Sequence, residues 1–448
     1  MFVGQYIKGL GGGMRHINVG IIGFGTVGSG VVEALINKRG HLSRRLGFAV
    51  NIVKICDSDL DRKRHVNVDS SLLTKDVNDI LDDPKVDIVI ELIGGIHPAY
   101  EIISRALKNK KHVVTANKAL LALKKESLFR LARDNSVQLR FEASVAGGVP
   151  IIKALREGLI SNRVNSVYGI INGTCNYILS GMTNFGIGFD EALANAQQKG
   201  YAEKSPAMDI NGLDSAHKLA ILASLGFGLN VRLSDMLIEG ISAITDADIK
   251  YAAEWGYVIK LLGIAKRTAA GLEVRVHPAL VPNKHPLASV NKNFNAIFIN
   301  TDMLGDSLFY GKGAGSVPTA SAVISDIADI SKDIVGASSC WTPGIVYDSY
   351  AGSIKKKDDF SSGYYVRFSA IDKPGVLARI SRILSEYKIS IAFVSQEARR
   401  QERIVPIVMM THIAKERDFT KALAEIDRLA FIKKKSVVIR VEESLNEK

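Results

Sequence analysis

The sequence predicts an α/β protein with three parts: a doubly wound parallel sheet, a mixed α+β domain, and a small C-terminal βαββαβ domain. First, short apolar runs alternate with amphipathic helices over residues 14–145, which favours a parallel sheet with helices on both faces. Second, strand and helix patterns are mixed over residues 160–305. Third, the order strand, helix, strand, strand, helix, strand begins at Tyr364, which is the ferredoxin-like pattern.

The first expected strand, residues 17–22, ends in a glycine-rich turn that leads into a helix. The turn GFGTVG places Gly23, Gly25 and Gly28 in the G-x-G-x-x-G spacing. Gly23 permits the tight turn, Gly25 lets the backbone approach a pyrophosphate, and Gly28 lets the helix pack close to the strand. The helix N-terminus also favours phosphates. The context therefore indicates a dinucleotide site, and the alternative is a turn without a ligand.

The second expected strand, AVNIVKICDSD, carries an acid at its end and a basic cluster after it. Asp57 would bind the ribose hydroxyls of NAD. Arg62, Lys63 and Arg64 would instead meet the 2′-phosphate of NADP. Alternatively, Asp57 or the three basic residues are simply charged side chains of a loop that is exposed to water. The choice between NAD and NADP therefore stays open at this point.

The next two expected strands lead to a candidate lysine. VDIVIELIGG, residues 86–95, is apolar up to Glu91, which is typical of a parallel strand buried on both faces. HVVTA then runs into Lys118 at the start of a helix. A cation there is disfavoured by the helix dipole by roughly 0.3–1 kcal/mol, yet ligands bind at this edge of such sheets. We interpret Lys118 as functional; the alternative is an extended lysine in water.

The segment 138–152 offers main-chain carbonyl oxygens beside Glu142 in the loop ASVAGGVP. Oxygen ligands suit a hard cation, and a hinge between domains explains the glycines equally well.

We predict four parts of the chain. Residues 14–145, completed by 310–335, form a nucleotide-binding domain, and residues 146–309 form a domain for substrate binding and dimerisation. Residues 336–362 form a linker, and residues 363–443 form the C-terminal domain.

A group of charged residues lies in the run 199–218. Glu203, Asp209 and Asp214 precede Lys218, and the last two share one helix face because they are four residues apart. Carboxylates beside an ammonium hold a polar substrate and keep a proton donor oriented. The alternative is an ordinary surface ion pair, worth roughly a few tenths of a kcal/mol.

The C-terminal domain opens with the turn DKPG and the helix VLARISRILSEYK. The N–H groups at this helix start would bind a carboxylate. The helix is expected to bury one apolar face, made of Val376, Leu377, Ile380, Ile383 and Leu384.

Composition narrows the classes of protein further. The net charge is +12, but the basic residues are scattered, which argues against nucleic acid and favours small anionic ligands. No apolar run is long enough for a membrane span, and no secretory signal is apparent, with either Met1 or Met14 as the start. Three widely spaced cysteines predict reduced thiols and a cytoplasmic protein without a disulfide framework or zinc site.

Taken together, several motifs resemble those of the homoserine dehydrogenase family, in its monofunctional form with a C-terminal ACT domain. The likeness covers about residues 16–443. Its motifs are GFGTVG, ELIGG, VVTANKALLA, EASVAGGVPII, INGTCNYIL, KGYAEKSPAMDINGLDSAHKLAILA and YGKGAGSVPTASAV, with DKPGVLARI as the ACT turn. The resemblance implies reversible reduction of L-aspartate 4-semialdehyde to L-homoserine by NADPH or NADH, on the route to threonine, methionine and isoleucine.

The resemblance also implies roles for individual residues. Lys218 matches the proton donor, and Lys118 matches a second active-site lysine near the nicotinamide. Gly200, Glu203, Asp209 and Asp214 are the substrate positions. The implied cofactor positions are Gly23, Phe24, Gly25, Thr26, Val27, Gly28, Asp57, Lys118, Gly200, Glu203 and Gly315; those of a sodium ion are Glu142, Val145, Gly147 and Val149; and those of an ACT effector are Asp372, Gly375, Val376 and Leu377.

From the resemblance we expect a homodimer or homotetramer, and feedback inhibition through the ACT domain by threonine or another amino acid of the same pathway. Two alternatives remain at the level of sequence. An ACT-bearing 2-hydroxyacid dehydrogenase would need a histidine acid paired with a carboxylate, and no histidine here lies in that setting. A non-catalytic sensor of a dinucleotide and an amino acid would not require both lysines.

Overall fold

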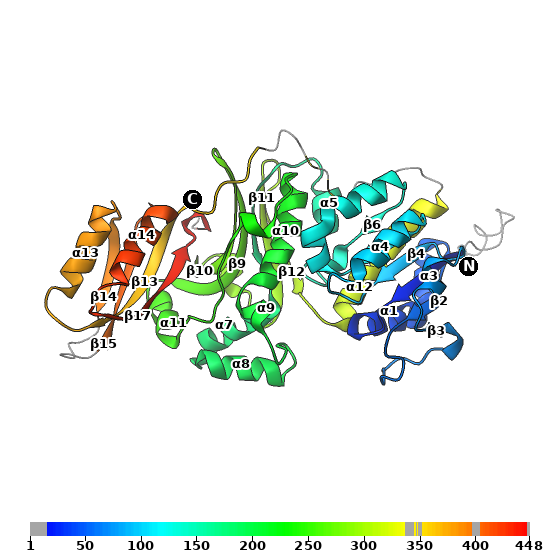
Figure 1. Ribbon diagram of the computed structural model, residues 1–448, viewed down its shortest axis with the longest axis horizontal. Coiled ribbons are helices and arrows are strands. Elements are labelled where there is room, and N and C mark those ends of the chain that lie inside the picture. Colours follow the sequence, from blue (N-terminus) through cyan, green and yellow to red (C-terminus); the bar gives the residue numbers. More distant parts are fainter. Residues whose placement is uncertain (1–15, 337–344, 346, 348–351, 397–403, 446–448) are drawn as a thin grey trace. The chain divides into compact units, whose positions relative to one another are not determined.

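The computed structural model describes residues 16–336, 345, 347, 352–396 and 404–445. Met14, which is a candidate start residue, lies outside these described residues. So does part of the expected linker, which was predicted to extend over residues 336–362. The chain forms two compact units (Figure 1). The first contains residues 1–158 and 314–346, and the second contains residues 159–313 and 347–448.

The first unit is built on a parallel sheet with the strand order β3-β2-β1-β4-β5-β6. Because the chain reverses direction across the sheet between β1 and β4, the carboxyl ends of these two strands form the usual ligand edge of a doubly wound fold. The predicted fold class is confirmed here. The strands are His16–Ile22 (β1), Ala49–Cys56 (β2), Leu73–Thr74 (β3), Ile88–Glu91 (β4), His112–Thr115 (β5) and Leu139–Arg140 (β6).

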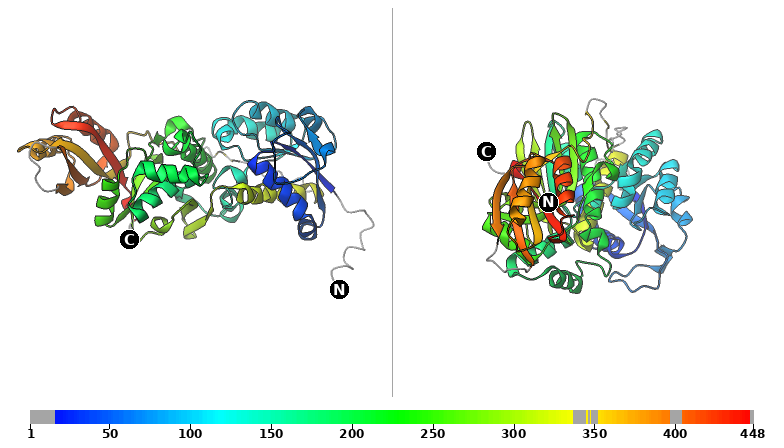
Figure 2. Two further views of the ribbon diagram at one scale, coloured as in Figure 1. Left: turned by 90° about the horizontal axis from the view of Figure 1, so that it is seen from below. Right: turned by 60° about the vertical axis from the view of Figure 1, so that its left-hand side comes forward.

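Helices cover both faces of this sheet (Figure 2). On one side α1 lies beside α12, a helix that the chain reaches only after passing through the second unit. Val31 of α1 and Val323 of α12 share one apolar core with strands β1 and β4. The helices of this unit are Thr26–Asn37 (α1), Arg39–Leu46 (α2), Asn78–Leu81 (α3), Ala99–Lys108 (α4), Lys118–Asp134 (α5), Ile151–Lys153 (α6) and Ser316–Val335 (α12).

The second unit contains, within its described residues, an eleven-stranded sheet with the main order β12-β11-β7-β9-β10-β17-β13-β15-β14. The strands from residues 164–312 are antiparallel neighbours in this sheet, apart from the short strand at residues 237–238, which pairs in parallel. They are Val164–Ile170 (β7), Leu237–Ile238 (β8), Tyr257–Thr268 (β9), Gly271–Pro282 (β10), Phe294–Thr301 (β11) and Gly305–Lys312 (β12).

The remaining strands belong to the C-terminal βαββαβ module, which confirms the predicted ferredoxin-like pattern. Its last strand pairs in parallel with β10, Ala279 opposite Arg440 and Leu280 opposite Val441, so the two sheets are continuous. The module contains Ser361–Ile371 (β13), Val376–Glu386 (α13), Ile391–Gln396 (β14), Ile404–Thr411 (β15), Ala414–Lys415 (β16), Glu416–Ile426 (α14) and Ile432–Val441 (β17).

Helix α13 buries most of the expected apolar face. Val376, Ile380, Ile383 and Leu384 are buried, but Leu377 is 37% exposed. The prediction was wrong for Leu377 because it lies in the first helical turn, at the edge of the apolar stripe. The other helices of the second unit are Gly173–Phe185 (α7), Phe189–Gln198 (α8), Ala207–Ile210 (α9), Leu213–Phe227 (α10) and Asp246–Glu254 (α11).

A buried lysine, Lys260 on β9, stands in the core of this unit. Its Nζ donates to the carbonyl oxygen of Val290 at 2.6 Å and to the side-chain oxygens of Asn176 and Asn291, both at 3.3 Å. Burial lowers the pKa of Lys260 from 10.5 to about 8. Because the folded pKa is the lower one, the unfolded chain binds more protons between about pH 8 and 10.5, and stability from this group rises with pH across that interval.

We expect the difference in unfolding free energy between wild type and Lys260→Met to grow in favour of wild type as pH rises through this interval. The full change is on the order of 3 kcal/mol. Urea titrations at several pH values measure it, and Lys250→Met, at an exposed position of α11, serves as the control. A difference that stays constant from pH 7 to 10.5 would show that burial does not perturb this lysine.

Candidate functional site

The glycine-rich turn has the geometry of a phosphate cradle. Gly23 has a φ of +104°, and a Cβ on Gly28 would lie 2.0 Å from the Gly23 carbonyl oxygen. By contrast, a Cβ on Gly25 would meet nothing within 4 Å, so the backbone there faces open space. Helix α1 starts at Thr26, and the first N–H groups of a helix have no intrahelical partners. The turn therefore fits the pyrophosphate of a dinucleotide.

We expect Gly28→Ala to weaken binding of NAD(P)H by at least about tenfold, because the added methyl group forces α1 away from the turn. Fluorescence titration of the purified protein with NADH and NADPH measures the affinity. Gly40→Ala is the matched control, since its Cβ would meet only Arg44 Nη1, at 3.6 Å. Unchanged affinity in Gly28→Ala would mean that the turn does not hold the dinucleotide.

The acid and one base at the end of β2 both contact the glycine-rich turn. Asp57 Oδ2 accepts the Phe24 N–H at 2.5 Å, and Arg64 Nε donates to the Phe24 carbonyl oxygen at 2.8 Å. The Arg64 guanidinium also lies over the Phe24 ring, 4.5 Å from its centroid. Arg62 and Lys63 are exposed. Both Arg64 and Asp57 are therefore placed beside the turn.

A hydrogen-bonded group joins the ends of β4 and β5. Glu91 is fully buried; its Oε1 accepts the N–H groups of Ile93 and Gly94 at 2.9 and 3.1 Å, and its Oε2 accepts Thr115 Oγ1 at 2.6 Å. Burial raises the pKa of Glu91.

Asn117 holds the beginning of α5 at the same edge of the sheet. Its Oδ1 caps the helix at the Leu120 N–H, at 3.1 Å, and its Nδ2 donates to the Gly95 carbonyl oxygen at 2.6 Å. Lys118, the first residue of α5, is thereby held at the carboxyl edge of the sheet.

The loop proposed for a cation is buried and closely tied to α12. Glu142 accepts the N–H groups of Ile152 and Lys153 at 2.9 and 2.7 Å, and its own N–H donates to Asp326 at 2.7 Å. Burial raises the pKa of Glu142, and burial followed by repulsion from Glu142 raises that of Asp326 to about 7. Two buried acids, Glu142 and Asp326, therefore lie close together in this loop region, and buried charges call for a compensating partner.

The charged group in the second unit is buried, not a surface pair. Lys218 Nζ lies 2.6 Å from Asp214 Oδ2 and donates to the Ile171 carbonyl oxygen at 2.7 Å; the side chains of Lys218 and Asp214 are 12% and 8% exposed. Asn172 Nδ2 donates to Asp209 Oδ1 at 2.7 Å and to Asp214 Oδ2 at 2.8 Å. An ammonium and two carboxylates are therefore held in one small polar cluster.

Two of the expected substrate residues lie apart from this cluster's hydrogen bonds. Glu203 and Gly200 are exposed in the turn after α8, where Gly200 has a φ of +71°. This turn is tied to α7 because Thr174 Oγ1 donates to the Tyr201 carbonyl oxygen at 2.7 Å. The contribution of Asn172 was missed from the sequence. The only local signal was an asparagine between a strand and a helix, which is typical of a helix N-cap.

The other expected positions lie at helix starts. Gly315, with a φ of +120°, precedes α12, whose first residue Ser316 donates from Oγ to the Thr26 carbonyl oxygen at 2.8 Å. In the C-terminal module Gly375 has a φ of +88° and precedes Val376 at the start of α13, with Asp372 half-buried in the same turn.

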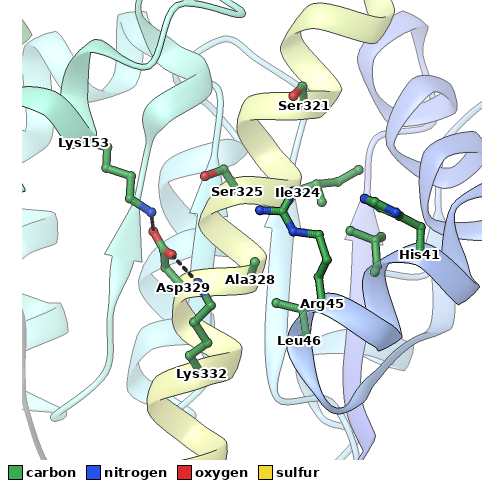
Figure 3. Close-up of a pocket in the computed structure, with 11 residues that line it drawn as sticks. His41, Arg45, Leu46, Lys153, Ser321, Ile324, Ser325, Ala328, Asp329 and Lys332 are labelled. Atoms are coloured by element: carbon green, nitrogen blue, oxygen red, sulfur yellow. Dashed lines mark hydrogen bonds and ion pairs between the residues drawn. The ribbon is translucent and has the colours of Figure 1, made fainter. Parts of the chain in front are cut away.

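A pocket of about 360 Å³ lies between α2 and α12 (Figure 3). Lys153 and Lys332 both reach Asp329, with nitrogen–oxygen distances of 2.6 and 3.6 Å, and Arg45 extends from the opposite wall. None of the expected site residues lines this pocket.

Among the described residues, no helix is both long and apolar enough to cross a membrane.

Comparisons with known proteins give matches that together extend over most of this chain. Family models match at three places: "Homoserine dehydrogenase, NAD binding domain" over residues 23–142, "Homoserine dehydrogenase" over 150–328, and "ACT domain" over 364–431. Homoserine dehydrogenases from Neisseria gonorrhoeae and Bacillus subtilis are 42% and 40% identical to it, with alignments covering 96% of this chain and 99% of each relative.

A crystal structure of a homoserine dehydrogenase from Thiobacillus denitrificans is similar over the same extent. It is 42% identical, covers 96% of this chain and 99% of its own, and has a TM-score of 0.88. The resemblance found in the motifs is thereby confirmed. This chain belongs to the homoserine dehydrogenase family of NAD(P)-dependent oxidoreductases and carries a C-terminal ACT domain.

Proposed function

We propose that the protein interconverts L-aspartate 4-semialdehyde and L-homoserine, on the route to threonine, methionine and isoleucine, with Lys218 as the proton donor in the direction of reduction. The observation that carries this assignment is the buried pairing of Lys218 with Asp214 beside Asp209. A lysine ammonium held by a carboxylate is a charged donor in a partly dehydrated setting, where its electrostatic effect is greater than in water.

The roles of the chain's own residues follow from this placement. A bound nicotinamide supplies the hydride. Lys218 stabilises the negative charge that develops on the aldehyde oxygen and delivers a proton to it. Asp214 holds the ammonium in place, and Asp209 and Glu203 bind the ammonium group of the amino-acid substrate. Lys118, held at the carboxyl edge of the first sheet, is assigned to the cofactor.

Steady-state assays test the proposal directly. The purified protein should oxidise NADH or NADPH when supplied with aspartate semialdehyde, and should reduce the oxidised cofactor when supplied with homoserine. Binding of both ligands without turnover would instead identify a sensor. The ratio of kcat/KM for NADPH and NADH reports which of Asp57 and Arg64 controls cofactor choice, since both lie beside the turn.

We also propose a monovalent cation, Na⁺, in the loop of Glu142, Val145, Gly147 and Val149, and a homodimer or homotetramer. A cation there would offset the two buried acids Glu142 and Asp326. Replacing sodium by a bulky organic cation in the assay buffer should lower thermal stability and activity together, whereas no response would argue against the site. Light scattering coupled to size exclusion gives the number of subunits.

For regulation, we propose that threonine binds at the ACT turn and inhibits the enzyme. Support comes from the N–H groups at the start of α13, beside Asp372 and Gly375. Truncation of the ACT domain is a poor test because it would expose the edge of β10, which pairs with β17. Asp372→Ala should weaken inhibition by threonine and leave the uninhibited rate intact; a wild-type enzyme that ignores threonine would refute this part.

A further inference from the structure

A single buried amide, that of Asn172, joins the two carboxylates of the proposed substrate site. Asn172 follows β7 and is the N-cap residue of α7, and it is 4% exposed. Its Oδ1 accepts the Cys175 N–H at 2.7 Å. Because that oxygen faces a backbone donor, the Nδ2 group has to face the other way, and the orientation of the amide is fixed by its surroundings.

The two hydrogens of Nδ2 are both used on acids. One bond goes to Asp209 Oδ1 at 2.7 Å and the other to Asp214 Oδ2 at 2.8 Å. The same Asp214 oxygen lies 2.6 Å from Lys218 Nζ. Asp209 stands on α9 and Asp214 on α10, so the amide connects side chains from two helices to the start of a third.

We propose that Asn172 is a positioning residue, which holds the Asp209 and Asp214 carboxylates in the spacing that homoserine requires and keeps Asp214 directed at Lys218. This inference rests on the proposed function. Like charges repel, so the buried Asp214 and the half-buried Asp209 need a shared donor to remain side by side. Hydrogen bonds to charged groups are worth about 1.5–3 kcal/mol, enough to decide their orientation.

The electrostatics of the cluster support this role. Burial raises the pKa of Asp209, and proximity to Asp214 raises it further, whereas the bond from Asn172 lowers it. Cys175 and Lys218 are the other titratable groups beside Asp209, and burial raises the pKa of the Cys175 thiol. The Cys175 thiol donates to the Asp209 carbonyl oxygen at 3.2 Å.

Two substitutions separate this role from simple helix capping. Serine is as good an N-cap as asparagine, but its hydroxyl cannot donate to both acids. If Asn172 only caps α7, Asn172→Ser should behave as wild type and Asn172→Ala should be impaired. If it positions the acids, both variants should raise the KM for homoserine at least about tenfold and lower kcat, with the KM for NAD(P)⁺ unchanged.

Asn176→Ser is the matched control. Asn176 is also a buried asparagine of α7, and its Nδ2 donates twice, but to the carbonyl oxygens of Val290 and Phe294 at 3.1 and 3.2 Å. Its replacement should cost thermal stability and leave the KM for homoserine intact.

Wild-type constants in Asn172→Ser, with an active wild-type enzyme, would overturn the positioning role. A wild-type enzyme without homoserine-dependent turnover would instead overturn the proposed function. In that case, binding of homoserine by the three variants, measured by calorimetry, still tests whether Asn172 arranges the two acids.

Discussion

Replacing Lys218 with methionine is expected to lower kcat by about 10²–10⁴-fold, the range typical of losing a general acid. The Lys218 ammonium is held by Asp214 and the Ile171 carbonyl oxygen, in a position from which it donates a proton to a reacting oxygen. Methionine keeps the length and apolar stem of lysine but supplies neither charge nor proton. Steady-state rates in both directions measure the loss, and NAD(P)H affinity should stay within about twofold.

Lys260→Met is the control for this substitution. Lys260 is also a buried lysine of the second unit that donates to a main-chain carbonyl, here that of Val290 at 2.6 Å. Its replacement should change stability but keep kcat near that of wild type. Equal losses of kcat in the two variants would indicate that any buried lysine in this unit affects activity through folding, and would remove Lys218 as the donor.

Replacing Arg440 with methionine is expected to destabilise the second unit by about 3–5 kcal/mol, because it leaves the buried acid Glu416 without its partner. The Arg440 guanidinium binds Glu416 from Nε at 3.0 Å and from Nη2 at 2.5 Å, and binds Glu239 from Nη1 at 2.6 Å. Its side chain is 3% exposed. These bonds join β17 and α14 of the ACT domain to the segment after β8.

The loss of stability caused by Arg440→Met should also perturb the proposed substrate site. Two residues after Glu239, the Ile241 N–H donates to the Ile210 carbonyl oxygen at 2.8 Å, next to Asp209. Urea unfolding gives the free energy, and Arg417→Met, on the exposed side of α14, should cost less than about 0.5 kcal/mol. A cost below about 1 kcal/mol for Arg440→Met would mean that the ion pairs do not hold the two domains together.

Local patterns predicted the parts of the site that depend on short sequence separations. The turn at Gly23–Gly28 is encoded by the glycines and the flanking strand and helix, and the structure bears out its geometry. Asp214 and Lys218 are paired because four residues of helix separate them. In each case backbone geometry alone brings the groups together.

Contacts between distant segments were not predictable in this way. Asn172 is separated from Asp209 and Asp214 by 37 and 42 residues, and no periodicity links them. The parallel pairing of β10 with β17 likewise depends on how two modules dock, and each module's strand pattern is complete without it. Such contacts are set by tertiary packing, so they emerge only from the folded chain.

The central claim is that this chain transfers hydride between a nicotinamide and the aldehyde carbon of aspartate semialdehyde. NAD(P)H deuterated at the transferring position of the nicotinamide, incubated with wild-type protein and aspartate semialdehyde, tests it most directly. The account predicts homoserine that carries one deuterium on the hydroxyl-bearing carbon, as measured by mass spectrometry, with far slower formation by Lys218→Met. Absence of labelled homoserine from a protein that binds both ligands would contradict it.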